Sequence, residues 1–200
     1  MSLDKQVGYK IQRKVASIGT EGEAYTYIMA QNGLWLDAWK PIGELYIGAT
    51  IPLMAEEVTV RGLEPVGFNL RLPGGPIPEY LWAQAKAVLI AAAPLEKYIA
   101  IVWDDERQEY ALQEASQLTT GVSVQYHMPA NIVVDLHSHN YMPAFFSGTD
   151  DEDDSGFRVS IVIGKVDEAE PEVLCRVGVY GYFCEVNLDD VFDLEEVVNE

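Results

Sequence analysis

Two histidines, a serine and an aspartate stand close together near the middle of the second half of the chain. They are His137, His139, Ser147 and Asp150, in the spacing H-x-H-x7-S-x-x-D. Imidazole nitrogens and carboxylate oxygens are common ligands of catalytic zinc, which takes three protein ligands and keeps a fourth position for water. A bound zinc ion lowers the pKa of that water toward 7 and prepares it for hydrolysis. The spacing therefore predicts one Zn²⁺ per chain, held by His137, His139 and Asp150.

A buried strand is expected to position the two histidines. Residues 131–136 are mainly β-branched and apolar, and they run directly into His137. Side chains i and i+2 of a strand project to the same face, so His137 and His139 should point together while Ser138 points away. The two imidazoles would then form a ready pair of nitrogen ligands.

Ser147 and Asp150 also have the spacing of a helix capping box, in which a serine closes the first turn of a helix. The two interpretations are compatible, because a capped helix start fixes Asp150 in space and the Ser147 hydroxyl can still face the metal. The acidic run at 151–154 favours a helix start as well, since the helix dipole stabilises carboxylates there. Direct contact of this run with metal or substrate is the alternative.

Hydrolysis also needs a general base, and Glu96 is the candidate. Residues 78–93 have the apolar periodicity of a helix that is bounded by prolines, and residues 94–103 are predicted to be a buried strand. Glu96 thus lies where a helix gives way to a core strand, which is unfavourable for a carboxylate without a function. An ordinary solvated position is the alternative. The neighbouring glutamates have the pattern of solvated residues: Glu79, Glu106 and Glu109.

These residues resemble the JAMM (MPN+, Mov34/PAD-1) zinc metallopeptidases, in which Pro-x-Glu follows an alanine-rich helix and precedes H-S-H-x7-S-x-x-D. The general resemblance covers about residues 76–185. Within that group, several stretches are similar to the PRTRC system protein A family, JAMM-like proteins of bacterial plasmid-type cassettes. These stretches are residues 31–36, 137–139, 144–151, 156–158 and 176–181.

The resemblance implies a role for each residue of the pattern. Glu96 would be the general base, and Ser147 would stabilise the oxyanion beside zinc held by His137, His139 and Asp150. The implied activity is hydrolysis of a peptide or isopeptide bond in a protein or peptide substrate. A ubiquitin-like protein and a ThiF-like protein of the same cassette are the implied partners. The alternative function is an MPN-type protein-interaction module whose metal site is vestigial or structural.

The resemblance also implies a fold, an α/β (α+β) core in which helices flank a mixed sheet, as in JAMM proteins and cytidine deaminases.

One departure from the family pattern is visible. Only residues 151–157 separate the last metal ligand from the next predicted strand, at 159–163. This leaves no room for the long insertions that grip ubiquitin in eukaryotic deubiquitinases, so specificity for ubiquitin chains is in doubt.

Two other metal-dependent classes share part of the pattern. D-x-H-x-H at 135–139 resembles the opening of PHP-type phosphoesterases and amidohydrolases, but these need several further histidines, and His127 is the one other histidine of the chain. Two histidines and a carboxylate are also the facial triad of non-haem Fe(II) oxygenases. The spacing of Ser147 and the presence of Glu96 favour zinc hydrolysis.

Composition narrows the class of protein further. The net charge of −19, from 13 basic and 32 acidic residues, argues against nucleic-acid binding, which needs a basic face. No apolar run is long enough to cross a membrane, and the start of the chain has no signal-peptide pattern. The sequence therefore predicts a soluble, cytoplasmic protein without a membrane partner, and the resemblance implies a bacterial one.

Three segments are expected along the chain. Residues 1–72 form a strand-rich accessory region, which includes a hairpin with a type I′ turn signal at 31–33. A stretch rich in proline and glycine follows, and residues 73–188 form the metallopeptidase domain. Residues 189–200 form an acidic tail that is expected to be helical or to fray.

Overall fold

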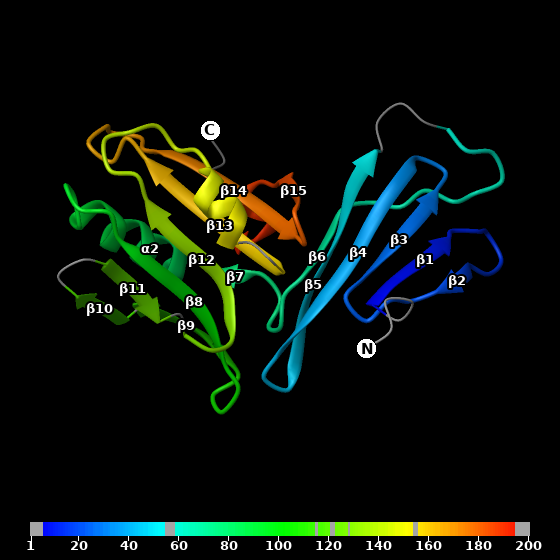
Figure 1. Ribbon diagram of the computed structural model, residues 1–200, viewed down its shortest axis with the longest axis horizontal. Helices are drawn as coiled ribbons and strands as arrows, with labels where there is room; N and C mark the ends of the chain where they lie inside the picture. Colours follow the sequence, from blue (N-terminus) through cyan, green and yellow to red (C-terminus); the bar gives the residue numbers. More distant parts are fainter. Residues whose placement is uncertain are drawn as a thin grey trace, which may run out of the picture. The chain divides into compact units, whose positions relative to one another are not determined.

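Figure 1 shows a computed structural model of the protein. The residues that it describes are 6–54, 59–114, 116–120, 123–127, 129–153 and 156–194. The chain divides into two compact units: Met1–Pro41 with Tyr46–Arg71, and Ile42–Leu45 with Leu72–Glu200. The described elements combine mixed sheets with few helices, so the chain has the α+β fold that the sequence predicts.

The first unit is built on one sheet with the strand order β2-β1-β3-β4-β5-β6. Its strands are β1 (Val7–Ile11), β2 (Ile18–Thr20), β3 (Tyr25–Ala30), β4 (Gly33–Ile42), β5 (Leu45–Met54) and β6 (Asn69–Arg71). The hairpin predicted around residues 31–33 is present, because β3 and β4 pair antiparallel from Ala30 and Gly33 onward. Its turn is not type I′, since that turn needs a positive φ at both central residues, and neither Gln31 nor Asn32 has one.

The second unit contains the sheet that carries the candidate site, with the strand order β15-β14-β13-β12-β8-β9. These strands are β8 (Tyr98–Asp104), β9 (Glu109–Glu114), β12 (Ile132–Ser138), β13 (Phe157–Gly164), β14 (Glu172–Val179) and β15 (Tyr182–Glu185). β12 runs parallel to β13 and antiparallel to β8 (Figure 1). These three central strands are almost continuously buried, which explains their unbroken apolar runs. β10 (Ser116–Thr120) pairs antiparallel with β11 (Ser123–His127).

Helix α2 (Glu79–Ala91) confirms the helix predicted before the core strands. It begins directly after Pro78, where the missing N–H of proline costs nothing. Its buried side chains are Leu81, Trp82, Ala85 and Leu89, and it packs against β8, β9 and β12. No helix among the described residues is long and apolar enough to cross a membrane.

The start of the acidic tail differs from its prediction. Leu188–Asp190 form a 3-10 turn (η1), and β16 (Phe192–Asp193) pairs parallel with β7 (Ile77–Pro78). The reason is burial, because Val191 and Phe192 are almost fully enclosed and the Phe192 ring lies 5.4 Å from that of Trp82. The rest of the predicted tail, residues 195–200, lies outside the described residues.

Candidate metal centre

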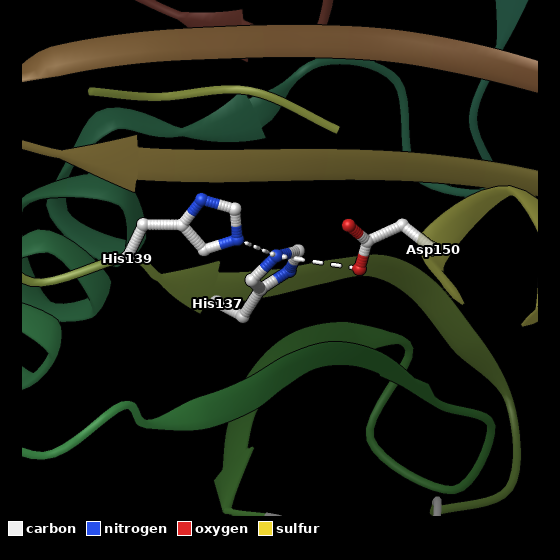
Figure 2. Close-up of side chains that lie close together, drawn as sticks. All are labelled: His137, His139 and Asp150. Atoms are coloured by element: carbon white, nitrogen blue, oxygen red, sulfur yellow. Dashed lines mark hydrogen bonds and ion pairs between the residues drawn. The ribbon is translucent and has the colours of Figure 1, made fainter. Parts of the chain in front are cut away.

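The backbone of the central sheet positions both histidines of the pattern. His137 is the next-to-last residue of β12 and pairs with Tyr98 of β8 on one side and Val162 of β13 on the other. The N–H of His139 donates to the carbonyl of Ile163 at 2.8 Å, so the pairing with β13 continues past the strand. Both side chains are buried, and their Nε2 atoms face each other at 3.1 Å (Figure 2). The sequence-predicted pair of imidazoles is therefore present.

Asp150 reaches the same point from a different element, the short helix α3 (Gly148–Asp153). Its Oδ1 lies 3.4 Å from Nε2 of His137 (Figure 2). One ligand atom from each of His137, His139 and Asp150 falls within 4.8 Å of the others, and these three residues are the one such group among the described residues.

The donor set fits a divalent metal ion. With bonds of about 2.0–2.2 Å, a tetrahedral zinc holds its nitrogen and oxygen ligands about 3.3–3.5 Å apart. The separations of 3.1 Å and 3.4 Å at His137 are close to this value, and the ligand atoms of His139 and Asp150 lie within 4.8 Å of each other. Two facing imidazole nitrogens and a carboxylate oxygen are the chemistry that zinc prefers. We infer that His137, His139 and Asp150 can hold one metal ion.

Ser147 fixes the orientation of the Asp150 carboxylate. The N–H and the hydroxyl of Ser147 both donate to Oδ2 of Asp150 at 2.6 Å, and the Ser147 hydroxyl accepts the N–H of Asp150 at 3.3 Å. This is the reciprocal pattern of a capping box, as the spacing predicts. Because Oδ2 is held in this way, Oδ1 is the oxygen turned toward the histidines.

The ionisation of two ligands suits metal binding. Burial lowers the pKa of His137 to about 4, helped by the charges of His139 and Arg176 and opposed by Asp150. Burial raises the pKa of Asp150, but the hydrogen bonds from Ser147 and the nearby imidazoles outweigh it, so the net pKa is lowered. At neutral pH His137 is therefore neutral and Asp150 ionised, the forms in which these side chains bind metals.

Glu96 lies on the segment next to the histidines, and its side chain is exposed. The N–H of Ser138 donates to the carbonyl of Lys97 at 3.1 Å, and the N–H of Lys97 donates to the Ser138 hydroxyl at 3.2 Å. The pairing of His137 with Tyr98 thus extends to Ser138 and Lys97. These contacts hold the segment that carries Glu96 beside the end of β12. The role of Glu96 as a base stays a prediction.

The strand predicted at 94–103 is shorter than expected, since β8 begins at Tyr98. This difference matters for the site, because it leaves Glu96 in a connecting segment at the sheet end instead of inside a strand. The neighbouring acidic side chains Glu79, Glu106 and Glu109 are exposed, in agreement with the sequence.

Charged residues inside the core strands were not singled out by the sequence reasoning. Asp135 of β12 is 1% exposed and forms an ion pair with Arg158 of β13 at 3.2 Å. Together with His137 and Asp150 they line a cavity of about 20 Å³, which is room for about one water molecule. Arg176 of β14 is buried beside the same site. A charged residue within an otherwise apolar strand pattern requires a buried partner. This signal could have identified both arginines from the sequence.

Comparison with protein families agrees with this geometry. The family model described as prokaryotic homologs of the JAB domain matches residues 78–177, half of the 200-residue chain. The matched stretch runs from the start of α2 into β14, and so contains Glu96, both histidines, Ser147 and Asp150. Comparison with curated proteins gives no match. With the metal centre and half of the chain in agreement, this protein belongs to the prokaryotic homologs of the JAB domain, in the JAB/MPN family.

Proposed function

We propose that this protein is a zinc-dependent metallopeptidase that hydrolyses a peptide or isopeptide bond. The observation that carries the proposal is the convergence of ligand atoms from His137, His139 and Asp150, with His137 neutral and Asp150 ionised at neutral pH. Membership of the JAB/MPN family supports it, because that family includes JAMM hydrolases as well as inactive members.

Each residue of the site would have a distinct role. An ion held by the two histidines and Asp150 supplies Lewis acidity and lowers the pKa of water at the site. Glu96 accepts the proton of the attacking water and later returns it to the leaving amine. The Ser147 hydroxyl, once rotated away from Asp150, donates to the oxyanion of the tetrahedral intermediate. One such donor typically contributes about 10²–10³ in rate.

The second candidate is a protein-interaction module of the MPN type, and two observations favour it. The Ser147 hydroxyl is engaged with Asp150, and the Glu96 carboxylate is exposed. In such a module the metal site would be vestigial or structural. Turnover is therefore the measurement that separates the two candidates, since both allow metal binding.

The substrate part of the proposal rests on the resemblance to JAMM proteins. We propose a protein or peptide substrate, with a ubiquitin-like protein of the PRTRC type of cassette and its ThiF-like neighbour as the partners to test. α3 ends at Asp153 and β13 begins at Phe157, so the chain has no long insertion there. This favours recognition of an extended tail over recognition of a folded ubiquitin surface.

The test combines metal analysis with cleavage of a ubiquitin-like fusion protein from the same type of cassette. We expect about one zinc per wild-type chain and cleavage of the fusion. His137→Ala should lose both metal and cleavage, whereas Glu96→Ala should keep the metal and lose cleavage. Glu79→Ala, which removes an exposed glutamate of α2, is the matched control and should behave like the wild type.

Two results would contradict the proposal. Full cleavage by Glu96→Ala would remove this residue from the mechanism. A wild-type protein that binds zinc tightly but cleaves no fusion, tail peptide or isopeptide-linked substrate would favour the interaction module.

A further inference from the structure

Arg176 is a buried cation next to the candidate metal centre, and its guanidinium group contacts two aromatic rings. It lies on β14 and is 5% exposed. Its Cζ atom is 3.8 Å from the centre of the Phe146 ring and 4.0 Å from the centre of the Phe183 ring. Cation–π contacts of this kind are strongest when the cation is desolvated, as it is here.

The same guanidinium forms an ion pair with Asp151, with 2.6 Å between Nη1 and Oδ1. Asp151 directly follows the metal ligand Asp150, and Phe146 directly precedes Ser147. Arg176 therefore contacts the residue on each side of the Ser147–Asp150 capping box. We call these contacts, made by Arg176 with Phe146 and Asp151, the arginine clamp.

The sheet holds the arginine clamp from the other side. Phe183 belongs to β15, and it pairs with Gly178 of β14, two residues after Arg176. β14 itself pairs along its full length with β13, the neighbour of the histidine strand β12 (Figure 1). The guanidinium is thus fixed relative to the strands that position His137 and His139.

α3 needs such an attachment. It has six residues, fewer than a helix requires to be stable by itself in water, and four of them are acidic. The capping box fixes Asp150 within α3, but its hydrogen bonds lie inside the segment 147–150 and do not fix α3 on the sheet.

We propose that Arg176 is a positioning residue for the metal ligand Asp150, and that it docks the start of α3 on the sheet at the distance that metal binding requires. This inference rests on the metal centre of the proposed function. Arg176 brings a positive charge close to the place of a metal cation, and the ion pair with Asp151 offsets that charge. Its planar shape fits between the two rings, so lysine should not replace it.

The test measures both the attachment of α3 and the affinity for metal. Amide hydrogen exchange of residues 146–153 is measured on the metal-free full-length protein, and zinc affinity by competition with a chromophoric chelator. The visible absorption of bound Co²⁺ reports the number of ligands. The variants are Arg176→Met, Arg176→Lys and Asp151→Ala, the last of which changes a side chain that is 46% exposed and should not prevent folding.

We expect Arg176→Met to weaken zinc binding about 10–100-fold, the range found for groups that orient metal ligands. Exchange at 146–153 should become about tenfold faster, and the Co²⁺ spectrum should change because Asp150 is no longer held in place. Arg176→Lys should not have the zinc affinity and exchange rates of the wild type. Asp151→Ala should show a smaller loss of zinc affinity and a smaller rise in exchange than Arg176→Met. Two controls should match the wild type: Arg71→Met, which removes a similar ion pair with Asp37 in the first unit, and Glu152→Gln, an exposed acid of α3.

Two outcomes would overturn the inference. One is a folded Arg176→Met or Asp151→Ala protein with unchanged exchange at 146–153 and unchanged affinity. The other is full rescue by lysine, which would reduce the role of Arg176 to its charge. A wild-type protein that binds neither zinc nor cobalt would refute the proposed function instead, and exchange in the metal-free protein would still decide whether Arg176 holds α3.

Discussion

The two halves of the metal centre are held by different kinds of interaction. His137 lies near the end of β12 and is paired with a strand on each side, and the N–H of His139, just after β12, donates to Ile163 of β13. Asp150 sits on a six-residue helix. Side chains hold that helix, through the Ser147 capping box and the arginine clamp.

This difference determines how each half responds to change. A backbone ladder in the core shares the stability of the whole sheet and opens only when much of the unit unfolds. A short helix attached by a few side chains can open locally at a much lower free energy. We therefore expect the positions of His137 and His139, the histidine half, to tolerate changes in neighbouring residues. The position of Asp150, the aspartate half, should depend on residues that do not bind the metal.

The largest effect should come from removing a ligand in the histidine half. His139→Ala takes away one of two nitrogen ligands, so zinc affinity should fall by more than the roughly 10–100-fold that a change beyond the ligands costs. Hydrogen exchange at residues 146–153 of the metal-free protein should change less than in Arg176→Met, because the capping box and the arginine clamp are intact. Chelator competition and exchange measure the two quantities, and zinc affinity within tenfold of the wild type would contradict the assignment of His139.

The free energy of unfolding should also depend on pH through the histidine half of the site. The pKa of His137 is lowered from 6.5 to about 4, so between these values the unfolded chain binds a proton that the folded chain does not. Its contribution to stability is therefore complete above pH 6.5 and is lost as the pH falls toward 4. At about 1.4 kcal/mol per pKa unit, the loss is on the order of 3 kcal/mol. Urea unfolding of the metal-free protein at several pH values measures it.

The matched variant for this measurement is His137→Gln, which cannot gain a proton. It should flatten the unfolding free energy between pH 6.5 and 4. The pKa of Asp150 is lowered as well, so this carboxylate adds a loss at still lower pH in both proteins. An equal slope for the wild type and His137→Gln between pH 6.5 and 4 would show that burial does not hold His137 neutral.

Patterns within single segments made all three candidate metal ligands predictable from the sequence. The alternation of a strand orients His137 and His139, the spacing of a capping box fixes Asp150, and apolar periodicity marks α2. Each of these signals depends on neighbours within a few residues, and the structure contains all three elements.

Contacts between distant segments could not be predicted in this way. Arg176 meets Phe146 and Asp151 from a strand that follows later in the chain, and no local pattern specifies that contact. The pairing of β16 with β7 likewise joins the two ends of the second unit and depends on burial of Phe192. An arginine in an apolar strand pattern could have indicated only that a partner exists, without identifying that partner.

The smallest effect should come from weakening the aspartate half at its cap. Ser147→Ala removes the hydroxyl that donates to Oδ2 of Asp150 and accepts its N–H. Loss of a capping side chain costs about 1 kcal/mol, so we expect zinc affinity to fall roughly fivefold and exchange at 146–153 to rise by a similar factor. Ser147→Thr keeps the hydroxyl and is the matched control for both measurements.

The same pair of variants separates the two roles of Ser147. If the hydroxyl only orients Asp150, saturating zinc should restore the cleavage rate of Ser147→Ala, because the ligand returns to its place once the metal is bound. If the hydroxyl also donates to the oxyanion, kcat should remain about 10²–10³-fold low at saturating zinc while KM changes little. Full recovery of kcat would show that Ser147 only sets the geometry of Asp150. The oxyanion would then need another donor.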